Sequence, residues 1–544
     1  RNILMYRILL PFLLLCSFHY AFAENILRVA VSQNVGDMNP QGYNLNQLYA
    51  QNMIYEGLVK TDSKGNITPS LALSWEIKDS GKSYIFHLRK NVLFSNGEPF
   101  NAQAVVKNFQ SILKNKARHS WSALVMTIDN VVALDDYAIK LTLKHPYIAT
   151  LNELALVRPF RFIAPSMIPQ DLDLAKNNPK KPIGTGPYML TDTKVGISNT
   201  FSKNPHYWDK ARYNGIYYDT IITKIIIDPN AKLVALKTKQ VDMIYGSDSI
   251  PIEIFHNIAE TKQFQTFVSP PAFTTFLIVN PSSKTLQDKN MREALALSID
   301  KAKIIESVYY GYQKEAQFLF NQNLPFTKTK SYTPPTYNKD KAEKILTQMG
   351  YTKKSDGYLY KDNKKLQVQL HFIANNPTQK AIATIMQAQL KDIGIFLELI
   401  PNEITMYRKK QTQGQFELCF SQTWGVPYEP FTFINSMRHQ GHADYMAQVA
   451  LPKTDSINKD SIDKAIKTLI ESPYDIYADS KKIDLNKAQE NLTKQTQRFL
   501  DMLYSTQIYI PLTYDTNKVV ARAGIKGIAP DVRAFEIPFW EFYE

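Results

Sequence analysis

Short apolar segments alternate with helical patterns along most of this chain. Segment 26–31 is apolar and contains β-branched residues, so we predict a buried first strand there. Similar segments return at 220–228, 241–245 and 272–279, and residues 232–238 between the first two have helical spacing. Because strands that alternate with helices form sheets covered by helices, this half of the chain is predicted to be α/β.

The second half of the chain continues this order. A strand at 366–373, a helix at 379–393 and a strand at 395–400 follow one another closely. A further helix over 485–503 leads to a late strand at 508–513. The predicted fold class is therefore α/β throughout.

Other segments are predicted to form helices or to lie on the surface. Residues 101–115 have their apolar side chains on one helical face, and residues 290–310 are predicted to be helical. A helix at 340–349 ends before Gly350, which is typical of a helix C-terminus. Residues 453–484 are polar, and we predict a surface excursion there.

The first residues have the pattern of a targeting segment. Two arginines are the only charges before Glu24, and an apolar stretch at 8–18 precedes the sequence Ala-Phe-Ala at 21–23. We therefore predict a cleavable signal peptide at 1–23 and an exported chain. Lipid anchoring through Cys16 is disfavoured, because a leucine stands where a small residue is required before it.

Composition narrows the function classes. The chain that follows the signal peptide is too long for one core, so two or three domains are expected. The net charge is +14, but Lys and Arg are spread along the chain, which argues against a nucleic-acid-binding tail. Cys419 is the only cysteine beyond the signal peptide, so we expect a buried structural thiol and no disulfide framework. Nucleophile-elbow and HExxH motifs are missing, and we predict that the protein is not an enzyme.

The segment 423–445 concentrates candidate chemistry. His439 and His442 lie three residues apart, and Trp424 and Tyr428 precede them among prolines and a glycine that favour a loop. Imidazole suits nickel, copper and zinc, so a metal site is one interpretation. The other is a long surface loop with incidental histidines, and the residues alone leave both open.

Two arginines are candidate anion anchors. Arg118 and Trp121 are three positions apart, so one helical turn would place both on one face. Arg158 lies in the mostly apolar run 151–166. A buried arginine needs a partner, so Arg158 is either part of a structural ion pair or an anchor for an anionic ligand, and both stay open.

Four motifs together resemble the family 5 extracytoplasmic solute-binding proteins of ABC importers, a group that serves oligopeptides, dipeptides, haem and nickel. The motifs are FSNGEPF at 94–100, PIGTGPY at 182–188, REALALSID at 292–300 and DKAEKILTQMGY at 340–351. The resemblance covers nearly the whole exported chain.

This resemblance implies a type II periplasmic-binding-protein fold, in the large family 5 form, with two α/β lobes joined by a two-stranded hinge. The first lobe would comprise 24–270 and 512–544, with an extra subdomain at about 67–181. The second lobe would comprise 271–511. The chain would cross between lobes near 269–275 and return near 510–513.

Within the family, four segments are similar to the nickel-binding members: ARHSW at 117–121, ELALVRPFRFIAPS at 153–166, TWGVPYEP at 423–430 and SMRHQGHADY at 436–445. Residue by residue, this implies that Arg118 and Arg158 grip the carboxylates of a metal chelate and that His442 ligates the metal. It also implies aromatic cleft walls at Tyr43, Trp121, Trp424, Tyr428 and Tyr407.

The chain departs from that pattern at three positions. Leu48 stands where a methionine is usual near the metal, and Gln422 replaces an arginine. His439 is an additional histidine and a second candidate ligand. These changes leave the nickel prediction standing but leave the chelator open.

The resemblance implies a periplasmic, monomeric carrier that captures nickel(II) as a small-molecule chelate, with histidine or a carboxylate metallophore, and delivers it to a membrane ABC permease. A guanidinium fork suits a carboxylate, and one imidazole cannot hold nickel tightly against water, so a chelator must supply the other ligands. No catalytic cofactor and no nucleic-acid partner are expected. The alternative is an oligopeptide, dipeptide or haem carrier of the same fold.

Overall fold

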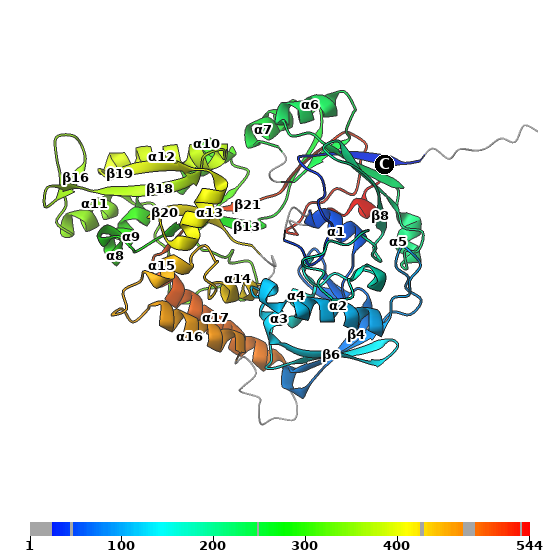
Figure 1. The fold of residues 1–544 in the computed structure, drawn as a ribbon. Coiled ribbons are helices and arrows are strands. Elements are labelled where there is room, and N and C mark those ends of the chain that lie inside the picture. The colour runs from blue at the N-terminus through cyan, green and yellow to red at the C-terminus, as the bar shows by residue number, and fades with distance from the viewer. Residues whose placement is uncertain (1–23, 44–46, 247–249, 425–428, 472–484, 534–535) are drawn as a thin grey trace, which may run out of the picture.

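Two lobes and two crossing segments make up the fold (Figure 1). This computed structural model describes residues 24–43, 47–246, 250–424, 429–471, 485–533 and 536–544. The predicted signal peptide at 1–23 lies outside the described residues. The α/β class predicted from the sequence is confirmed.

The first lobe is built on a seven-stranded sheet with the order β12-β22-β11-β1-β10-β9-β8. β1 (Ile26–Val31) runs parallel to β10 (Thr220–Ile225) and β11 (Met243–Tyr245), and its apolar residues are largely buried, as a central strand requires. The other strands are β8 (Tyr188–Lys194), β9 (Ser198–Lys203), β12 (Gln265–Val268) and β22 (Lys518–Ala521). The helices of this part are α1 (Leu48–Ile54), α5 (Lys210–Gly215), α6 (Pro229–Lys237) and α7 (Ile252–Thr261).

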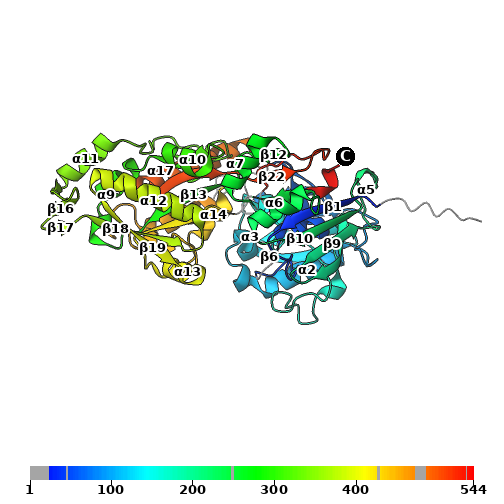
Figure 2. The same cartoon turned by 90° about the horizontal axis from the view of Figure 1, so that it is seen from above.

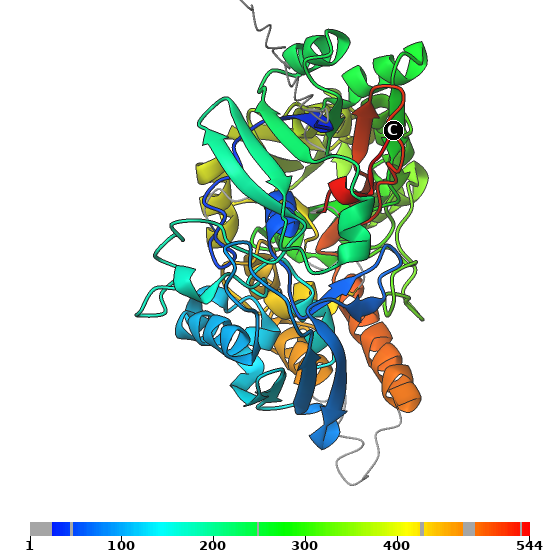
Figure 3. The same ribbon diagram turned by 90° about the vertical axis from the view of Figure 1, so that its right-hand side faces the viewer.

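A four-stranded antiparallel sheet, β4-β5-β7-β6, extends the first lobe. Figure 3 shows its blue strands at the opposite end of the lobe from the green strands of the larger sheet. The elements are β4 (Ala72–Lys78), β5 (Ser83–Leu88), α2 (Ala102–Lys114), η2 (Lys116–His119), α3 (Ala123–Thr127), β6 (Ile128–Asp135), β7 (Ala138–Leu143) and α4 (Thr150–Leu154). The hairpin of β2 (Val59–Thr61) and β3 (Ile67–Pro69) precedes them. The side chain of Asn101 accepts a hydrogen bond from Ala104 N and so begins α2.

The second lobe has a six-stranded sheet with the order β14-β21-β13-β20-β18-β19. Its strands are β13 (Phe273–Val279), β14 (Lys314–Glu315), β18 (Gln367–Ile373), β19 (Phe396–Asn402), β20 (Leu418–Gln422) and β21 (Tyr509–Asp515). A three-stranded sheet of β15 (Thr352–Lys353), β16 (Leu359–Lys361) and β17 (Lys364–Lys365) projects from it. The helices include α8 (Lys284–Gln287), α11 (Lys339–Gln348), α12 (Pro377–Ile393), α13 (Ile404–Gln413), α14 (Phe431–Ser436) and α15 (Tyr445–Val449).

The helical prediction at 290–310 is confirmed. The segment forms two helices, α9 (Lys289–Leu297) and α10 (Lys301–Tyr309), because the Asp300 side chain accepts from Lys303 N and begins a new helix. One prediction in this lobe is corrected. Part of the predicted surface excursion at 453–484 is the amphipathic helix α16 (Lys459–Glu471), which packs on α17 (Leu485–Ser505).

The chain crosses between the sheets twice. β12 ends at Val268 in the first lobe, and β13 begins at Phe273 in the second. The return was expected near 510–513, but β21 continues to Asp515 in the second sheet. The return therefore lies at 516–517. The two crossing segments are bonded to each other, because Asn517 N donates to Ser269 Oγ at 2.8 Å.

The lobes also touch away from the hinge. α14 of the second lobe packs against α3 of the first (Figure 1), and Figure 2 shows the two lobes side by side from above. Apolar residues from both lobes join in one buried cluster at this contact. Within the described ranges, no helix has the length and apolar character needed to cross a membrane.

Candidate functional site

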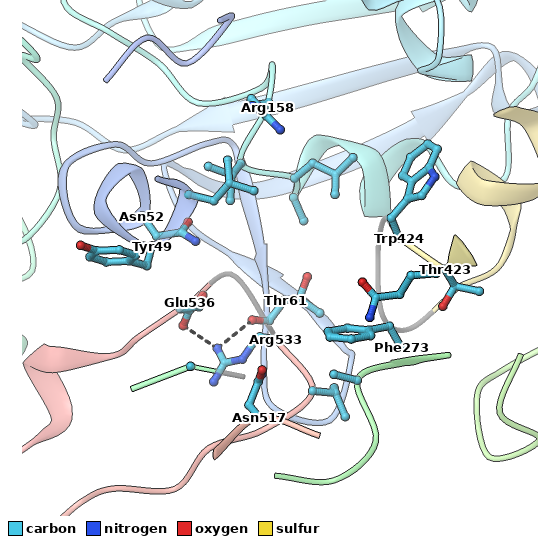
Figure 4. Close-up of a pocket in the computed structure, with 18 of the residues that line it drawn as sticks. Tyr49, Asn52, Thr61, Arg158, Phe273, Thr423, Trp424, Asn517, Arg533 and Glu536 are labelled. Atoms are coloured by element: carbon cyan, nitrogen blue, oxygen red, sulfur yellow. Dashed lines mark hydrogen bonds and ion pairs between the residues drawn. The ribbon is translucent and has the colours of Figure 1, made fainter. Parts of the chain in front are cut away.

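A cavity of about 850 Å³ lies between the lobes and is lined by residues of both. Figure 4 shows Arg158 on one side of it, Arg533 and Glu536 on the opposite side, and Trp424 and Phe273 along a third. Its volume and its mixture of aromatic walls with a few polar groups are typical of a small-molecule site.

Two guanidinium groups lie over one tyrosine ring at one end of this cavity. The Cζ atoms of Arg158 and Arg118 are 5.1 and 5.9 Å from the ring centroid of Tyr43. Arg158 lines the cavity and donates to Gly42 O at 3.2 Å. Arg118 is exposed and is not part of the cavity lining, although the shared ring places it beside Arg158. The structure thus brings together both predicted anion anchors.

A chain of hydrogen bonds holds Tyr43 in place. Trp121 Nε1 donates to the Tyr43 hydroxyl at 2.7 Å, and this hydroxyl lies 2.6 Å from His119 Nδ1. Burial, together with the charges of Arg118 and Arg158, lowers the pKa of His119 to about 4, so its imidazole is neutral and Nδ1 can accept the hydroxyl proton. Tyr43 therefore presents its ring, and His119 is a supporting residue that sequence reasoning missed. Its place inside the motif ARHSW was the available signal.

Aromatic rings close the cavity across the lobe boundary. Trp121 of the first lobe and Trp424 of the second meet edge to face, with centroids 5.8 Å apart. Trp424 also packs against Phe433 at 5.6 Å, and its side chain is 39% exposed. Such a wall covers a ligand while one face of it still reaches solvent.

His442 lies behind this wall. Its ring centroid is 4.8 Å from that of Phe433 and 6.0 Å from that of Trp424, both of which line the cavity. Its Nδ1 is bonded to the buried carboxylate of Asp444, which also accepts from the hydroxyl of Tyr509.

This arrangement orients the His442 ring. Burial alone would raise the pKa of Asp444, but the charge and hydrogen bond of His442 outweigh burial and lower it. A carboxylate only accepts, so the Nδ1 that faces Asp444 carries a proton. Among the described residues Nε2 has no hydrogen-bond partner, and in the tautomer that carries its proton on Nδ1 this atom offers a lone pair to a metal. An imidazole oriented in this way by a carboxylate is the usual form of a metal ligand.

The remaining predicted residues lie elsewhere. Tyr407 is a correction: it is 5% exposed and donates to Phe420 O at 2.6 Å, so it belongs to the core and not to the cavity wall. His439 is half-buried, with its pKa lowered by burial and by Arg438, and it is not part of the cavity lining. Tyr428 lies outside the described residues.

Two positions that depart from the family pattern, Leu48 and Gln422, lie at the cavity. Leu48 lines the cavity. Gln422 also lines it, and its Nε2 donates to Asp515 Oδ2 at 3.0 Å, so it links β20 to β21 across the intervening β13 instead of offering a charge.

The far side of the cavity carries paired charges. Arg533 is held by Asp531 and by Glu536, and its Nη1 donates to Glu536 Oε1 at 2.7 Å (Figure 4). Glu429 is a further acid on the cavity wall, and burial raises its pKa to about 7. Over the described part of the chain, no group of three or more His, Cys, Asp or Glu side chains is arranged to hold a metal ion.

Comparisons with known proteins agree with the fold. The sequence matches the bacterial extracellular solute-binding proteins, family 5 middle, over residues 66–445. It is 34% identical to the nickel-binding periplasmic protein of Escherichia coli (strain K12), over 96% of this chain and 95% of that protein. It is 27% identical to the oligopeptide-binding protein AppA of Bacillus subtilis (strain 168), over 63% of each. The crystal structure of NikA from Brucella suis in complex with Fe(III)-EDTA superposes with a TM-score of 0.87 at 36% identity, covering 95% of this chain and 99% of that one.

Proposed function

The chain belongs to the bacterial extracellular solute-binding proteins of family 5, and from this premise we propose that it captures nickel(II) as a small-molecule chelate in the cavity between its lobes. The observation that supports the proposal is His442, whose Nδ1 is held by Asp444 and whose Nε2 has no hydrogen-bond partner among the residues that the structure describes. The relatives named for nickel binding and for Fe(III)-EDTA support a metal complex as cargo.

The arginine end of the cavity would bind the chelator. The Arg158 and Arg118 guanidinium groups lie beside the Tyr43 ring, where a chelate with two or more carboxylates would receive parallel hydrogen bonds. A nickel chelate with two histidine molecules and a carboxylate metallophore both satisfy this requirement. The neutral pair of Tyr43 and His119 adds no competing negative charge.

The metal would be held by His442 and by atoms of the chelator. One imidazole supplies one coordination position, and nickel in water needs several more, which histidine-type or carboxylate ligands provide. Trp424 and Phe433 cover His442 in the structure, so the metal would reach Nε2 when the Trp424 side chain shifts. The 39% exposure of Trp424 gives it room to do so. His439 is a second candidate ligand after such a rearrangement.

Capture would close the two lobes. Residues 24–270 with about 516–544 form the first lobe in this proposal, and about 271–515 form the second. A chelate that contacts Arg158 in one lobe and His442 in the other favours the closed form, because it binds that form better. The closed carrier, exported by the signal peptide at 1–23 into the periplasm, would act as a monomer and deliver its cargo to a membrane ABC permease.

A peptide carrier is the alternative, since the oligopeptide-binding relative shares part of the chain. Such a carrier needs an accessible carboxylate for the free amino group of the peptide. Asp444 is fully buried and engaged by His442 and Tyr509, and Glu536 is paired with Arg533. Glu429 on the cavity wall is buried and accepts hydrogen bonds from Phe431 N and from Thr432. These engagements favour the metal chelate.

Tryptophan fluorescence of the exported chain, residues 24–544, tests the proposal, because Trp121 and Trp424 lie at the cavity. The titrants are nickel alone, nickel with excess histidine, and short peptides. We expect quenching with nickel plus histidine and a much weaker response of His442→Ala. A response to peptides with none to nickel in any form would overturn the proposal in favour of a peptide carrier.

A further inference from the structure

Two buried glutamates meet where the lobes touch. Glu153 belongs to α4 of the first lobe and is 0% exposed, and Glu429 precedes α14 of the second lobe and is 5% exposed. The Thr432 hydroxyl lies 2.6 Å from Glu429 Oε1 and 3.4 Å from Glu153 Oε1. One hydroxyl proton cannot serve both oxygens fully, so closure of the lobes leaves the two carboxyl groups facing each other.

In the first lobe, neutral donors surround Glu153. Tyr147 donates its hydroxyl proton at 2.6 Å and Leu124 its backbone N–H at 3.1 Å, and the hydroxyl of Ser122 is also bonded to it. The pKa of Tyr147 lies well above its usual value, because of burial and the two nearby carboxyl groups, so this phenol stays neutral.

In the second lobe, Glu429 is bonded in the same manner. It accepts from Phe431 N at 2.5 Å and from Thr432 N at 3.2 Å, besides the Thr432 hydroxyl. Among the residues that the structure describes, neither glutamate forms an ion pair, and the charged group that acts on Glu429 is Glu153.

Cations on the adjacent elements face other acids. α16 packs on α14, and its Lys459 pairs with Asp463 at 2.6 Å. β2 packs on α4, and Lys60 of β2 interacts with Glu56. Arg161, which follows α4 in the chain, also interacts with Glu56, and it donates a hydrogen bond to Ala155 O at the end of α4. α3, which contacts α14, has no titratable side chain. Among the described residues, two like charges would therefore meet in a buried contact without a compensating cation.

We propose that Glu153 and Glu429 form a proton-binding site that is completed when the lobes close, so that the protein takes up a proton as it captures its cargo. The cargo is that of the proposed function, and the proton site stands on the lobe contact itself. The proton sits on one carboxyl oxygen and leaves again when the lobes separate and water reaches both groups. Capture and release are then coupled to pH.

The direction of the coupling follows from the two states. In this proposal, opening of the lobes exposes both carboxyl groups to water and so lowers their pKa values towards the usual glutamate value of about 4.3. In the closed form, burial raises the pKa of Glu429 to about 7 and raises that of Glu153 as well. The closed form binds the proton more tightly than the open form. The closed form therefore becomes more stable relative to the open form as the pH falls from about 7 towards 5. Above about pH 7 both carboxyl groups are ionised in the closed form, so the free-energy cost that they add to closure no longer changes with pH.

Isothermal titration calorimetry with nickel–histidine tests this coupling. At one pH near 7, buffers with different heats of protonation give the number of protons taken up on binding. We expect the wild type to take up a fraction of a proton more than Glu429→Gln, whose amide keeps the shape without the charge. Glu260→Gln, on the exposed face of α7, is the matched control and should equal the wild type.

Affinity across pH gives the second measurement, because protonation of the chelator and of His442 cancels in the ratio of two proteins. Glu429→Gln should bind at least several-fold more tightly than the wild type at pH 8, and the two should converge by pH 5. The proposal would be overturned if the wild type and Glu429→Gln took up the same number of protons and the ratio of their affinities did not change with pH. Glu153→Gln makes the same test if the first variant melts at a markedly lower temperature. If the wild type does not bind nickel–histidine, the proposed cargo is refuted, and the proton count is measured with whichever titrant binds.

Discussion

Replacing Asp444 by Asn removes the carboxylate that orients His442 while keeping the shape of the side chain. In the structure Asp444 is 0% exposed and accepts from His442 Nδ1, from the Tyr509 hydroxyl and, at 3.4 Å, from Gln448 Nε2. Asparagine has one acceptor oxygen and one donor amide in the same space. It therefore cannot accept from both His442 and Tyr509 along the directions that Asp444 uses.

The consequence for His442 depends on which group faces it. If the amide N–H faces Nδ1, the imidazole proton moves to Nε2, and the lone pair proposed to bind nickel is lost. If the oxygen faces Nδ1, the tautomer survives, but the negative charge that strengthens Nε2 as a ligand is gone. Changes of this kind at the partner of a metal-binding histidine lower metal affinity about 10- to 100-fold, which is about 1.4 to 2.7 kcal/mol.

Fluorescence titration with nickel–histidine measures the affinity of Asp444→Asn, and nitrogen NMR of labelled histidine reports the tautomer directly. Tyr509→Phe is the matched control, because it removes one hydrogen bond to Asp444 and leaves the carboxylate facing His442. We expect a clearly smaller loss in this control. An Asp444→Asn protein that melts normally and binds with wild-type affinity would refute the role of Asp444 and weaken the assignment of His442.

Three further changes test the site and the fold. Arg158→Lys keeps the charge but loses the two-pronged donor, so we expect about tenfold weaker binding of the chelate, and unchanged calorimetric affinity would contradict a carboxylate at this end. Trp424→Phe should retain binding but lose much of the fluorescence change. An undiminished change would show that another tryptophan reports binding. Gly184→Ala should destabilise the first lobe by about 1 to 3 kcal/mol in urea unfolding, because its Cβ would lie 2.1 Å from Ile54 O. Gly215→Ala, which meets nothing within 4 Å, is its control, and equal unfolding midpoints would refute the packing argument.

Several elements were predictable because their signals are local. The first strand at 26–31 was predicted with its observed bounds, and the helix at 379–393 differs by two residues from α12 (Pro377–Ile393). Apolar periodicity states which side of a segment is buried, and that side is set by the residues of the segment itself. The surface assignment of 453–484 failed because the overall polarity of this segment hid isoleucines at helical spacing, such as Ile462 and Ile466.

Some residues of the candidate site could also be predicted from the sequence. Arg118 and Trp121 were expected on one face, and both contact Tyr43 in the structure. The motifs that resemble nickel-binding relatives led to Arg158 and His442, although their binding roles remain predictions. The same reasoning placed Tyr407 on the cavity wall, and the side chain is instead in the core.

The sequence by itself determined the α/β class, the family and a short list of site residues, since each depends on local pattern or on motifs within short segments. Only the tertiary structure decided that Asp444 holds His442, that His119 holds Tyr43, and that Glu153 faces Glu429. The first pairing depends on a local turn in the second lobe, the second on packing within the first lobe, and the third on the contact between the lobes. A side chain reveals in sequence how much it favours burial, but its partner is chosen by the packing of segments far away along the chain.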